Sequence, residues 1–282
     1  MSSDPAGPDF SPPGFVGCYR HPERSTGISC QRCHRPICGE CMQPASVGFQ
    51  CPRCVGRGQA SVRQPRTRYG ASLQAGEGTA TKVVMAALGV VYLLDLVTGG
   101  LASGLLAMSN LAVSQGQFWR LLTSALVSGS LFGVLTNLLV LWLAGRAIEA
   151  ELGAWRFGVL YLAAGLGGAT LFFVLGPPFG VSIGASSAVI GLLAANTIGK
   201  LKNQEDVRPD IGLFVLLLLY ALLVGFQSFG WLTLLGGIAV GALAGAVFAY
   251  APRRNRGTVQ VVGLLGVLLL CLVAVLARLV LG

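Results

Sequence analysis

Four pairs of metal-ligating residues, each pair with a two-residue gap, lie near the start of this sequence. They are Cys18 and His21, Cys30 and Cys33, Cys38 and Cys41, and Cys51 and Cys54. A two-residue gap lets two side chains bind one tetrahedral Zn²⁺ from a tight turn, so four pairs supply two four-ligand sites. Because both ligand sets are full, we expect two structural Zn²⁺ ions and no open position for a catalytic water.

The alternative reading of these cysteines is a disulfide framework, which needs an oxidising compartment. Seven cysteines cannot all pair, and residues 1–17 lack the basic region and apolar stretch of a signal peptide. How the eight ligands divide is open, although only four residues separate Cys33 from Cys38, which favours interleaving. Interleaved sets would be Cys18, His21, Cys38 and Cys41, and Cys30, Cys33, Cys51 and Cys54. His34 is an alternative ligand that we expect to face solvent.

The rest of the chain has the composition of a membrane protein. Apolar residues make up 54% of the 282 positions and charged residues 11%, against about 25% charged in a typical soluble domain. Residues 1–82 carry 15 of the 31 charges, and seven of the eight cysteines lie before residue 55. We therefore expect a disordered N-terminus (1–17), a double zinc-binding module (18–54), a flexible basic linker (55–82) and a membrane domain (83–282). The net charge of +9 divides as +5 in residues 1–82 and +4 in the remainder, so neither part is basic enough to suggest binding of nucleic acid, and we expect no nucleic-acid partner.

Seven apolar segments predict seven membrane-spanning helices. They lie at about 83–98, 131–148, 156–175, 185–199, 211–227, 231–250 and 259–281. Lys and Arg concentrate in alternate loops, so the positive-inside rule predicts a cytosolic N-terminus and an outer C-terminus in the plasma membrane. Cysteine thiols stay reduced in the cytosol, which agrees with the zinc interpretation. The half-apolar connection 99–130 is expected in the membrane interface, with Trp119 as an aromatic anchor.

Small residues at four-residue spacing mark two of these segments. Gly237, Gly241 and Gly245 lie in the sixth, and Gly184, Ala188, Gly191 and Ala195 in the fourth. In lipid, such stripes let helix backbones approach closely. We therefore expect these two helices to pack tightly against neighbours.

A set of motifs resembles the rhomboid family of intramembrane serine proteases. The set is Phe118-Trp119-Arg120, Asn137, Gly145-Arg146-Ala147-Ile148-Glu149, Gly184-Ala185-Ser186-Ser187 and Gly236-Gly237-x3-Gly241. The resemblance covers about residues 80–250, and the zinc-ligand pattern is similar to interleaved B-box and RING-like modules. It implies an all-α membrane protein: a rhomboid-like bundle of six transmembrane helices plus a seventh, with a small N-terminal cytosolic zinc-binding domain.

The resemblance also implies a site and exposes a departure from the family pattern. Ser186 matches the nucleophile, Asn137 the oxyanion-hole residue, and Leu234 the position of the family's catalytic histidine. Two further family histidines align with Gly133 and Ser128, and Ser187 replaces the usual glycine. The only histidines of the chain, His21 and His34, lie in the head.

Three functions compete. The first is an inactive pseudoprotease that binds transmembrane helices of client proteins within the bilayer, while its zinc module recruits a cytosolic protein. The second is an active rhomboid endopeptidase with an atypical base, for which Asp95 is the candidate, since an intramembrane acid is a functional suspect. The third, a small transporter, is disfavoured because the fifth and seventh segments offer almost no polar residues to line a path. Without a base, we expect Ser186 to be a helix N-cap and Asp95 to hydrogen-bond the adjacent loop.

Overall fold

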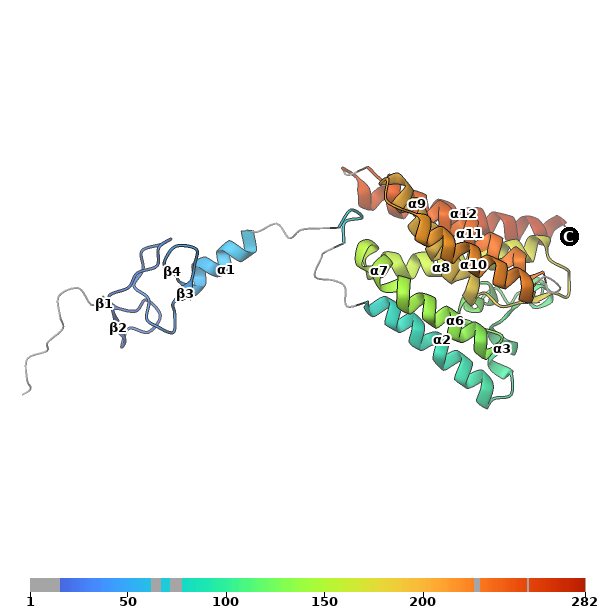
Figure 1. The fold of residues 1–282 in the computed structure, drawn as a ribbon, viewed down its shortest axis with the longest axis horizontal. Coiled ribbons are helices and arrows are strands. Elements are labelled where there is room, and N and C mark those ends of the chain that lie inside the picture. The colour runs from blue at the N-terminus through green and yellow to red at the C-terminus, as the bar shows by residue number, and fades with distance from the viewer. Residues whose placement is uncertain (1–15, 62–66, 72–77, 226–228, 253, 282) are drawn as a thin grey trace, which may run out of the picture. The chain divides into compact units, whose positions relative to one another are not determined.

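The computed structural model describes residues 16–61, 67–71, 78–225, 229–252 and 254–281. The chain divides into two compact units, Met1–Gln64 and Pro65–Gly282 (Figure 1). The disorder expected for 1–15, and the flexibility expected for linker residues 62–66 and 72–77, lie outside the described residues.

The first unit is a small body built around its cysteines. Two short antiparallel hairpins precede one helix: β1 (Val16–Gly17) with β2 (Ser25–Thr26), β3 (Gln43–Pro44) with β4 (Phe49–Gln50), and α1 (Pro52–Ser61). Its buried cluster consists of Ile37 and six cysteines, with Tyr19, Cys33 and Met42 packed against it. So small an apolar core rarely stabilises a domain without metal ions or disulfides.

The second unit is a bundle of long helices (Figure 1). The helices are α2 (Thr79–Val97), α6 (Leu131–Val140) running through a π-helical turn η2 (Leu141–Gly145) into α7 (Arg146–Leu152), α8 (Ala154–Leu175), α9 (Ala185–Lys202), α10 (Arg208–Gly225), α11 (Gly230–Tyr250) and α12 (Arg256–Leu281). Each of the seven predicted apolar segments is thus helical where it is described. The expectation of an all-α membrane protein with a small N-terminal cysteine-rich unit is confirmed.

Five of these helices are long and apolar enough to cross a membrane, judged over the described residues. They are Thr79–Val97, Leu131–Leu152, Ala154–Leu175, Gly230–Tyr250 and Arg256–Val280. Of the seven predicted spans, α9 and α10 are not among them. The sequence of α9 explains its absence, because it includes Asn196, Lys200 and Lys202. Since most of α9 is surrounded by protein, it needs less apolar surface than a helix that faces lipid.

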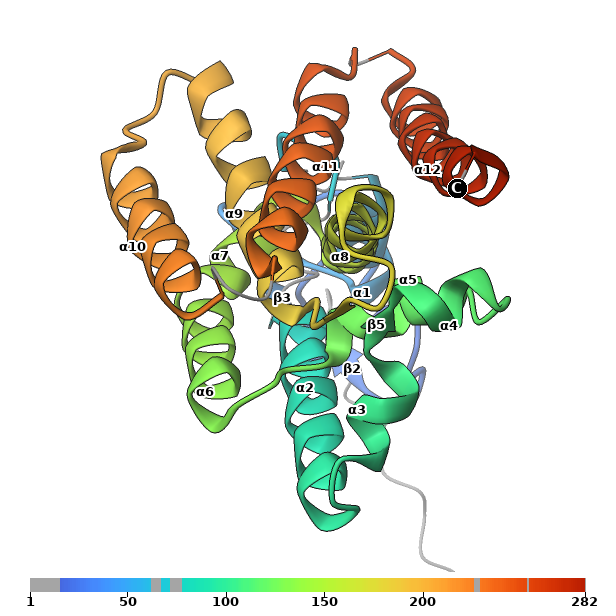
Figure 2. The ribbon, with the colours of Figure 1, turned by 90° about the vertical axis from the view of Figure 1, so that its right-hand side faces the viewer.

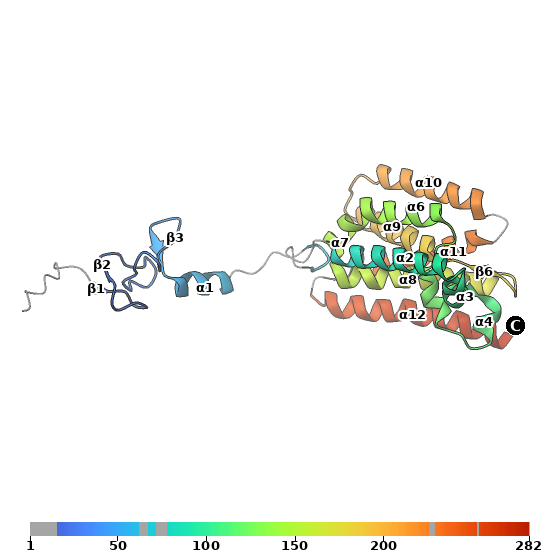
Figure 3. The same ribbon diagram turned by 90° about the horizontal axis from the view of Figure 1, so that it is seen from below.

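Three helices, α8, α9 and α11, form the centre of the bundle and pack most extensively on one another (Figure 2). Buried residues make up 61% of the apolar window of α8 and 56% of that of α11, but 11% for α2 and 22% for α12. The helices α10 and α12 lie at opposite edges of the bundle (Figure 3). The peripheral helices α2 and α12 therefore leave most of their apolar residues exposed, as helices that face lipid do.

The predicted small-residue stripes lie where α9 and α11 meet. A Cβ on Gly241 would lie 2.3 Å from the carbonyl oxygen of Gly191, and one on Gly237 would lie 2.4 Å from that of Ser187. A Cβ on Gly245 would lie 2.6 Å from Cα of Ala195. No real side chain tolerates such distances, so glycine sets the separation of these two helices along three turns.

The connection between α2 and α6 folds into short elements. They are α3 (Leu101–Leu106), β5 (Met108–Ser109), α4 (Asn110–Ser114), α5 (Arg120–Thr123) and a 3₁₀ turn η1 (Ser124–Leu126). The strand β5 pairs with β6 (Val181–Ser182), just before α9. Arg120 is buried and donates to the carbonyl oxygen of Ala107 (2.9 Å) and to Oε1 of Gln117 (2.7 Å), whereas the Trp119 side chain is 55% exposed. The charge of Arg120 therefore organises the connection, and the adjacent Trp119 is free to meet the membrane.

The segment expected as a linker contains more structure than its composition indicates. Residues 55–61 continue α1, and α2 begins at Thr79 instead of residue 83. The cause of the earlier start is Glu149, a fully buried residue of α7. Its carboxylate accepts hydrogen bonds from N–H of Ala80 (2.9 Å), N–H of Thr81 (2.7 Å) and Oγ1 of Thr81 (2.7 Å). A helix start that is satisfied from another helix has no local sequence signature.

Candidate functional site

The eight predicted metal ligands form two groups in the first unit. One is Cys18, His21, Cys38 and Cys41; the other is Cys30, Cys33, Cys51 and Cys54. Within each group all ligand atoms lie within 4.8 Å of one another. This is the interleaved arrangement, and His34 belongs to neither group.

The distances within the groups match a tetrahedral metal site. His21 Nδ1 lies 3.4 Å from Cys38 Sγ and 3.5 Å from Cys41 Sγ, and Cys33 Sγ lies 3.7 Å from Cys51 Sγ. Thiolates bound at about 2.3 Å to one tetrahedral ion would be about 3.8 Å apart. All eight cysteines are free thiols, so no disulfide competes for these positions. Each group could hold a metal ion.

The electrostatics of both groups favour a bound cation. Burial raises the pKa of the Cys18 thiol, but hydrogen bonds from the backbone outweigh burial and lower this pKa to about 6. The same balance lowers the pKa of Cys30 to about 6, with the N–H of Cys51 donating to its sulfur at 3.2 Å. Burial and the neighbouring Cys18 raise the pKa of Cys41 to about 11. Hydrogen bonding with Cys51, together with burial, raises the pKa of Cys54 to about 12. A bound metal dication would favour the deprotonated form of these last two thiols against burial and hydrogen bonding.

In the membrane domain, the predicted nucleophile Ser186 is the second residue of α9. The helix begins at Ala185, and its N-cap is Gly184, which makes no side-chain capping hydrogen bond. The expectation that Ser186 is the N-cap is therefore wrong. The turn is held from the α2–α6 connection, because the N–H of Gly184 donates to the carbonyl oxygen of Ser124 at 2.9 Å.

The structure brings three of the predicted positions together in one polar chain. Asn137 is buried, and its Nδ2 donates to Ser186 Oγ at 3.3 Å and to Ser128 Oγ at 3.4 Å. These residues come from α6, from the start of α9 and from the end of the α2–α6 connection. A neutral amide can orient and polarise a hydroxyl, but it cannot take its proton as a general base does.

The position matching the family histidine is occupied by a packed aliphatic side chain. Leu234 in α11 is 5% exposed and belongs to the same buried cluster as Ala185 and Ala188 of α9. The chain thus places an apolar group on the face of α11 that packs near the start of α9.

Ser187, which replaces the usual glycine, is accommodated by glycines on the neighbouring helices. Its side chain is fully buried and donates to the carbonyl oxygen of Gly184 at 2.7 Å. A Cβ on Gly168 of α8 would lie 2.5 Å from Ser187 Oγ, and a Cβ on Gly237 of α11 would lie 2.9 Å from Ser187 Cβ. The hydroxyl therefore serves packing at the junction of three helices.

The candidate atypical base, Asp95, is engaged in the turn that follows α2. Its Oδ1 accepts the N–H of Ser103 at 2.6 Å, in the first turn of α3. This is the loop hydrogen bond expected from the sequence. The structure also contains a hydroxyl contact that the sequence does not predict. Ser182 Oγ and Thr233 Oγ1 lie 2.6 Å apart, and both residues are buried. Neither residue stands in a motif, and no sequence signal indicates this contact.

Comparison with known proteins assigns the membrane domain. Residues 115–251 match the family model described as "Rhomboid domain". The "Rhomboid protease GluP" of Bacillus subtilis is 32% identical over 195 residues, which cover 67% of this chain and 37% of that protein. The "Rhomboid protease GlpG" of Salmonella paratyphi A is 28% identical over 202 residues, covering 71% of this chain and 72% of that protein. The "RHOMBOID-like protein 1" of Arabidopsis thaliana is 34% identical over 151 residues, covering 51% and 38%. The chain thus spans less than half the length of several curated relatives that it matches.

Proposed function

We propose that this chain, a membrane protein of the rhomboid family with a rhomboid domain, binds transmembrane segments of other membrane proteins without cleaving them. Its fold resembles that of intramembrane proteases, and the first question is whether Ser186 can act as a nucleophile.

One observation carries the proposal: the hydroxyl of Ser186 is hydrogen-bonded to the amide of Asn137 at 3.3 Å, and the membrane domain contains no histidine. A serine hydroxyl needs a base within hydrogen-bond reach to become a nucleophile at neutral pH. Leu234 cannot serve as that base, and the carboxylate of Asp95 is bonded to the N–H of Ser103.

Client binding is supported by the parts of the scaffold that remain. The close approach of α9 and α11, the buried Arg120 and the capping carboxylate of Glu149 all have defined contacts, although the family's base is absent. Two relatives carry the name "Rhomboid protease", and an intramembrane protease must bind its transmembrane substrate before cleaving it. A chain that keeps the scaffold and lacks the base would still bind a transmembrane segment but would not cleave it.

For the first unit we propose two structural Zn²⁺ ions, one held by each ligand group, and a role in recruiting a cytosolic protein. Thiolate and imidazole ligands at tetrahedral spacing favour zinc. Each bound ion would tie two distant turns of the unit together. A cytosolic location for this unit is supported by the distribution of Lys and Arg in the loops and by its seven cysteines, none of which forms a disulfide.

The test is activity-based labelling of the purified full-length chain with a fluorophosphonate probe. We expect no covalent label at Ser186 under conditions in which an active rhomboid protease is labelled. In a parallel assay, photo-crosslinkable transmembrane peptides in liposomes should attach to the membrane domain and stay intact. Labelling that disappears in Ser186→Ala would refute the inactive assignment, and failure of every peptide to crosslink would refute client binding.

A further inference from the structure

A short motif at the start of the second unit folds onto the end of the helical bundle. Residues Thr67–Ala71 form a closed turn in which the N–H of Thr67 donates to the carbonyl oxygen of Ala71 at 2.8 Å. The N–H of Gly70 donates to the carbonyl oxygen of Thr67 at 2.9 Å, and the N–H of Ala71 donates to Oγ1 of Thr67 at 3.0 Å. With Gly70 at φ 90°, a conformation that favours glycine, the turn directs Tyr69 into the bundle.

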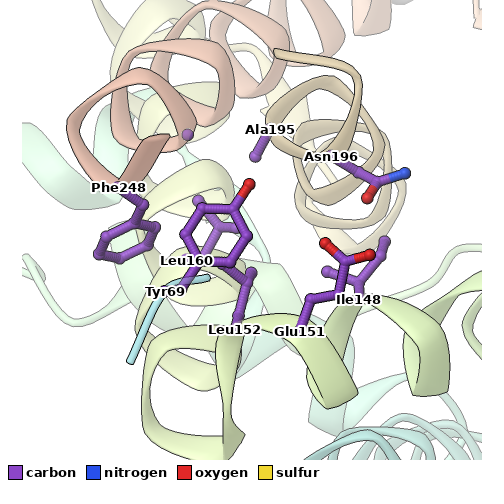
Figure 4. A pocket seen from close by; sticks show the side chains of 9 residues that line it. Tyr69, Ile148, Glu151, Leu152, Leu160, Ala195, Asn196 and Phe248 are labelled. Atoms are coloured by element: carbon purple, nitrogen blue, oxygen red, sulfur yellow. The ribbon is translucent and has the colours of Figure 1, made fainter. Parts of the chain in front are cut away.

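Tyr69 fills a pocket between four helices. Its ring is 8% exposed and lies among side chains of α7, α8, α9 and α11, with its hydroxyl directed toward Ala195 (Figure 4). The lining residues are Ile148, Glu151, Leu152, Leu160, Ala195, Asn196, Gly245 and Phe248. The space left beside the ring is about 10 Å³, no more than one water molecule occupies. Burial, together with the nearby carboxylate of Glu151, raises the pKa of the Tyr69 phenol, so the ring is docked in its neutral form.

Two glycines provide the room for this motif. A Cβ on Gly199 of α9 would lie 2.3 Å from the hydroxyl oxygen of Tyr69. A Cβ on Gly153, between α7 and α8, would lie 2.8 Å from Cβ of Ala71. The receiving surface is therefore shaped to this segment and would reject it if either glycine gained a side chain.

Polar contacts continue from the motif to the start of α10. Thr67 Oγ1 donates to the carbonyl oxygen of Glu151 at 2.7 Å. Arg68 forms an ion pair with Glu205 in the α9–α10 connection, three residues after α9 ends. The motif thus holds this connection. Lys200 pairs with Asp210, in the first turn of α10, at 2.6 Å. The buried Tyr69 and the α9–α10 connection are therefore joined by one set of polar contacts, which runs from Thr67 and Arg68 to Asp210.

We infer that Thr67–Ala71 is an anchoring motif that ties the linker of the cysteine-rich unit to the α9–α10 end of the bundle and holds α10 in place. The cysteine-rich unit ends at Gln64, three residues before the motif. A partner that pulls this unit or its linker would withdraw Tyr69, break the Arg68–Glu205 pair and free the start of α10. This inference concerns control of the bundle and does not depend on whether the chain cleaves its clients.

Hydrogen–deuterium exchange of the full-length chain in lipid nanodiscs tests the anchor. In Tyr69→Ala, we expect roughly tenfold faster exchange at residues 67–71 and in the α9–α10 connection, residues 203–210. Tyr69→Phe keeps the ring and should exchange as the unaltered chain does. Gly199→Val should match Tyr69→Ala, because the new side chain occupies the position of the Tyr69 hydroxyl while the sequence of the motif stays unchanged. Tyr92→Ala, which removes a tyrosine ring from α2, is the control and should leave both regions unchanged.

A surface variant distinguishes loss of the anchor from general destabilisation of the bundle by the core substitutions. Glu205→Gln removes the ion pair with Arg68 and no buried group, so it should speed exchange at residues 203–210 alone. The inference is overturned if Tyr69→Ala affects only residues 67–71. It is equally overturned if Tyr69→Ala raises exchange uniformly, α8 included, and Glu205→Gln leaves the connection unchanged.

Discussion

The side-chain amide of Asn137 donates to the hydroxyl of Ser186 across 3.3 Å and to the hydroxyl of Ser128 across 3.4 Å. One residue thus links the end of the α2–α6 connection to the start of α9. Inside an apolar bundle, polar groups that satisfy one another stabilise a single arrangement. Asn137, Ser128 and Ser186 therefore form one polar contact between three elements of the bundle.

Removing this amide should destabilise the membrane domain. In Asn137→Leu, the hydroxyls of Ser128 and Ser186 lose a shared donor in a buried site, which costs about 1–3 kcal/mol. Thermal unfolding of the full-length chain in detergent would show a lower midpoint. Thr136→Val is the matched control on the same helix, because Thr136 bonds only the carbonyl oxygen of Phe132 in its own turn. An equal loss in both variants would contradict a structural role for the polar chain.

A histidine introduced at Leu234 should create measurable protease activity. Leu234 shares a buried cluster with Ala185 and Ala188, next to Ser186 in sequence, and a positioned general base contributes about 10²–10⁴-fold in rate. Leu234→His combined with Gly133→His should therefore raise cleavage of a model transmembrane substrate by about 10²-fold. For the second change, a Cβ on Gly133 would lie 3.2 Å from Ser130 Oγ and within 4 Å of no other neighbouring atom, so Ser130 alone must shift to admit it.

Two further variants decide how that result is read. Leu235→His places the imidazole on the adjacent, 43% exposed residue and should give no gain. Adding Ser186→Ala to the active variant should abolish its activity. A gain that survives Ser186→Ala would show that another residue is the nucleophile.

The sequence predicts the parts of this molecule that depend on composition and spacing. The seven apolar segments became helices, and the small-residue stripes lie in the contact between α9 and α11. The four ligand pairs lie in interleaved order, the arrangement that the short run from Cys33 to Cys38 favours. In each case the information is local or periodic, which is why it can be read from one sequence.

Features that depend on contacts between distant residues were not predictable. Glu149 caps α2 from a position 68 residues later than Thr81, and no local pattern indicates it. Tyr69 stands in a stretch rich in Gly, Ser, Gln and Arg that reads as a linker, yet a pocket assembled from four helices buries its ring. The sequence favours Ser186 as the N-cap of α9, but the N-cap is Gly184. Its N–H is bound by Ser124 of the α2–α6 connection, which is remote in sequence.

Replacing a glycine in the α9–α11 contact by a larger residue should destabilise the bundle. In Gly241→Ala, the new Cβ would lie 2.3 Å from the carbonyl oxygen of Gly191 and 2.6 Å from its Cα. Since both obstacles are backbone atoms, the helices must separate, at a cost of about 1–3 kcal/mol. Gly266→Ala is the control, because a Cβ on this α12 residue has no neighbour within 4 Å. It should unfold at the same or a slightly higher temperature, since alanine favours helix; equal destabilisation of both would contradict the packing model.

Metal removal should unfold the cysteine-rich unit and leave the membrane domain intact. The purified chain should contain two zinc ions, counted by elemental mass spectrometry, because each ligand group fits one tetrahedral ion. A strong chelator should increase hydrogen exchange across residues 16–61, since binding and folding are coupled in a unit with so small a core. The thermal midpoint of the helical bundle should not change.

Single substitutions then separate the two metal sites. Cys38→Ser and Cys51→Ser should each lower the metal content from two ions to one, because the ligand groups share no residue. Cys271→Ser is the control: Cys271 is buried in α12, outside both groups, and this variant should retain two ions. A loss of both ions in Cys38→Ser alone would mean that the second site folds only after the first. Full occupancy in all three variants would refute the ligand assignment.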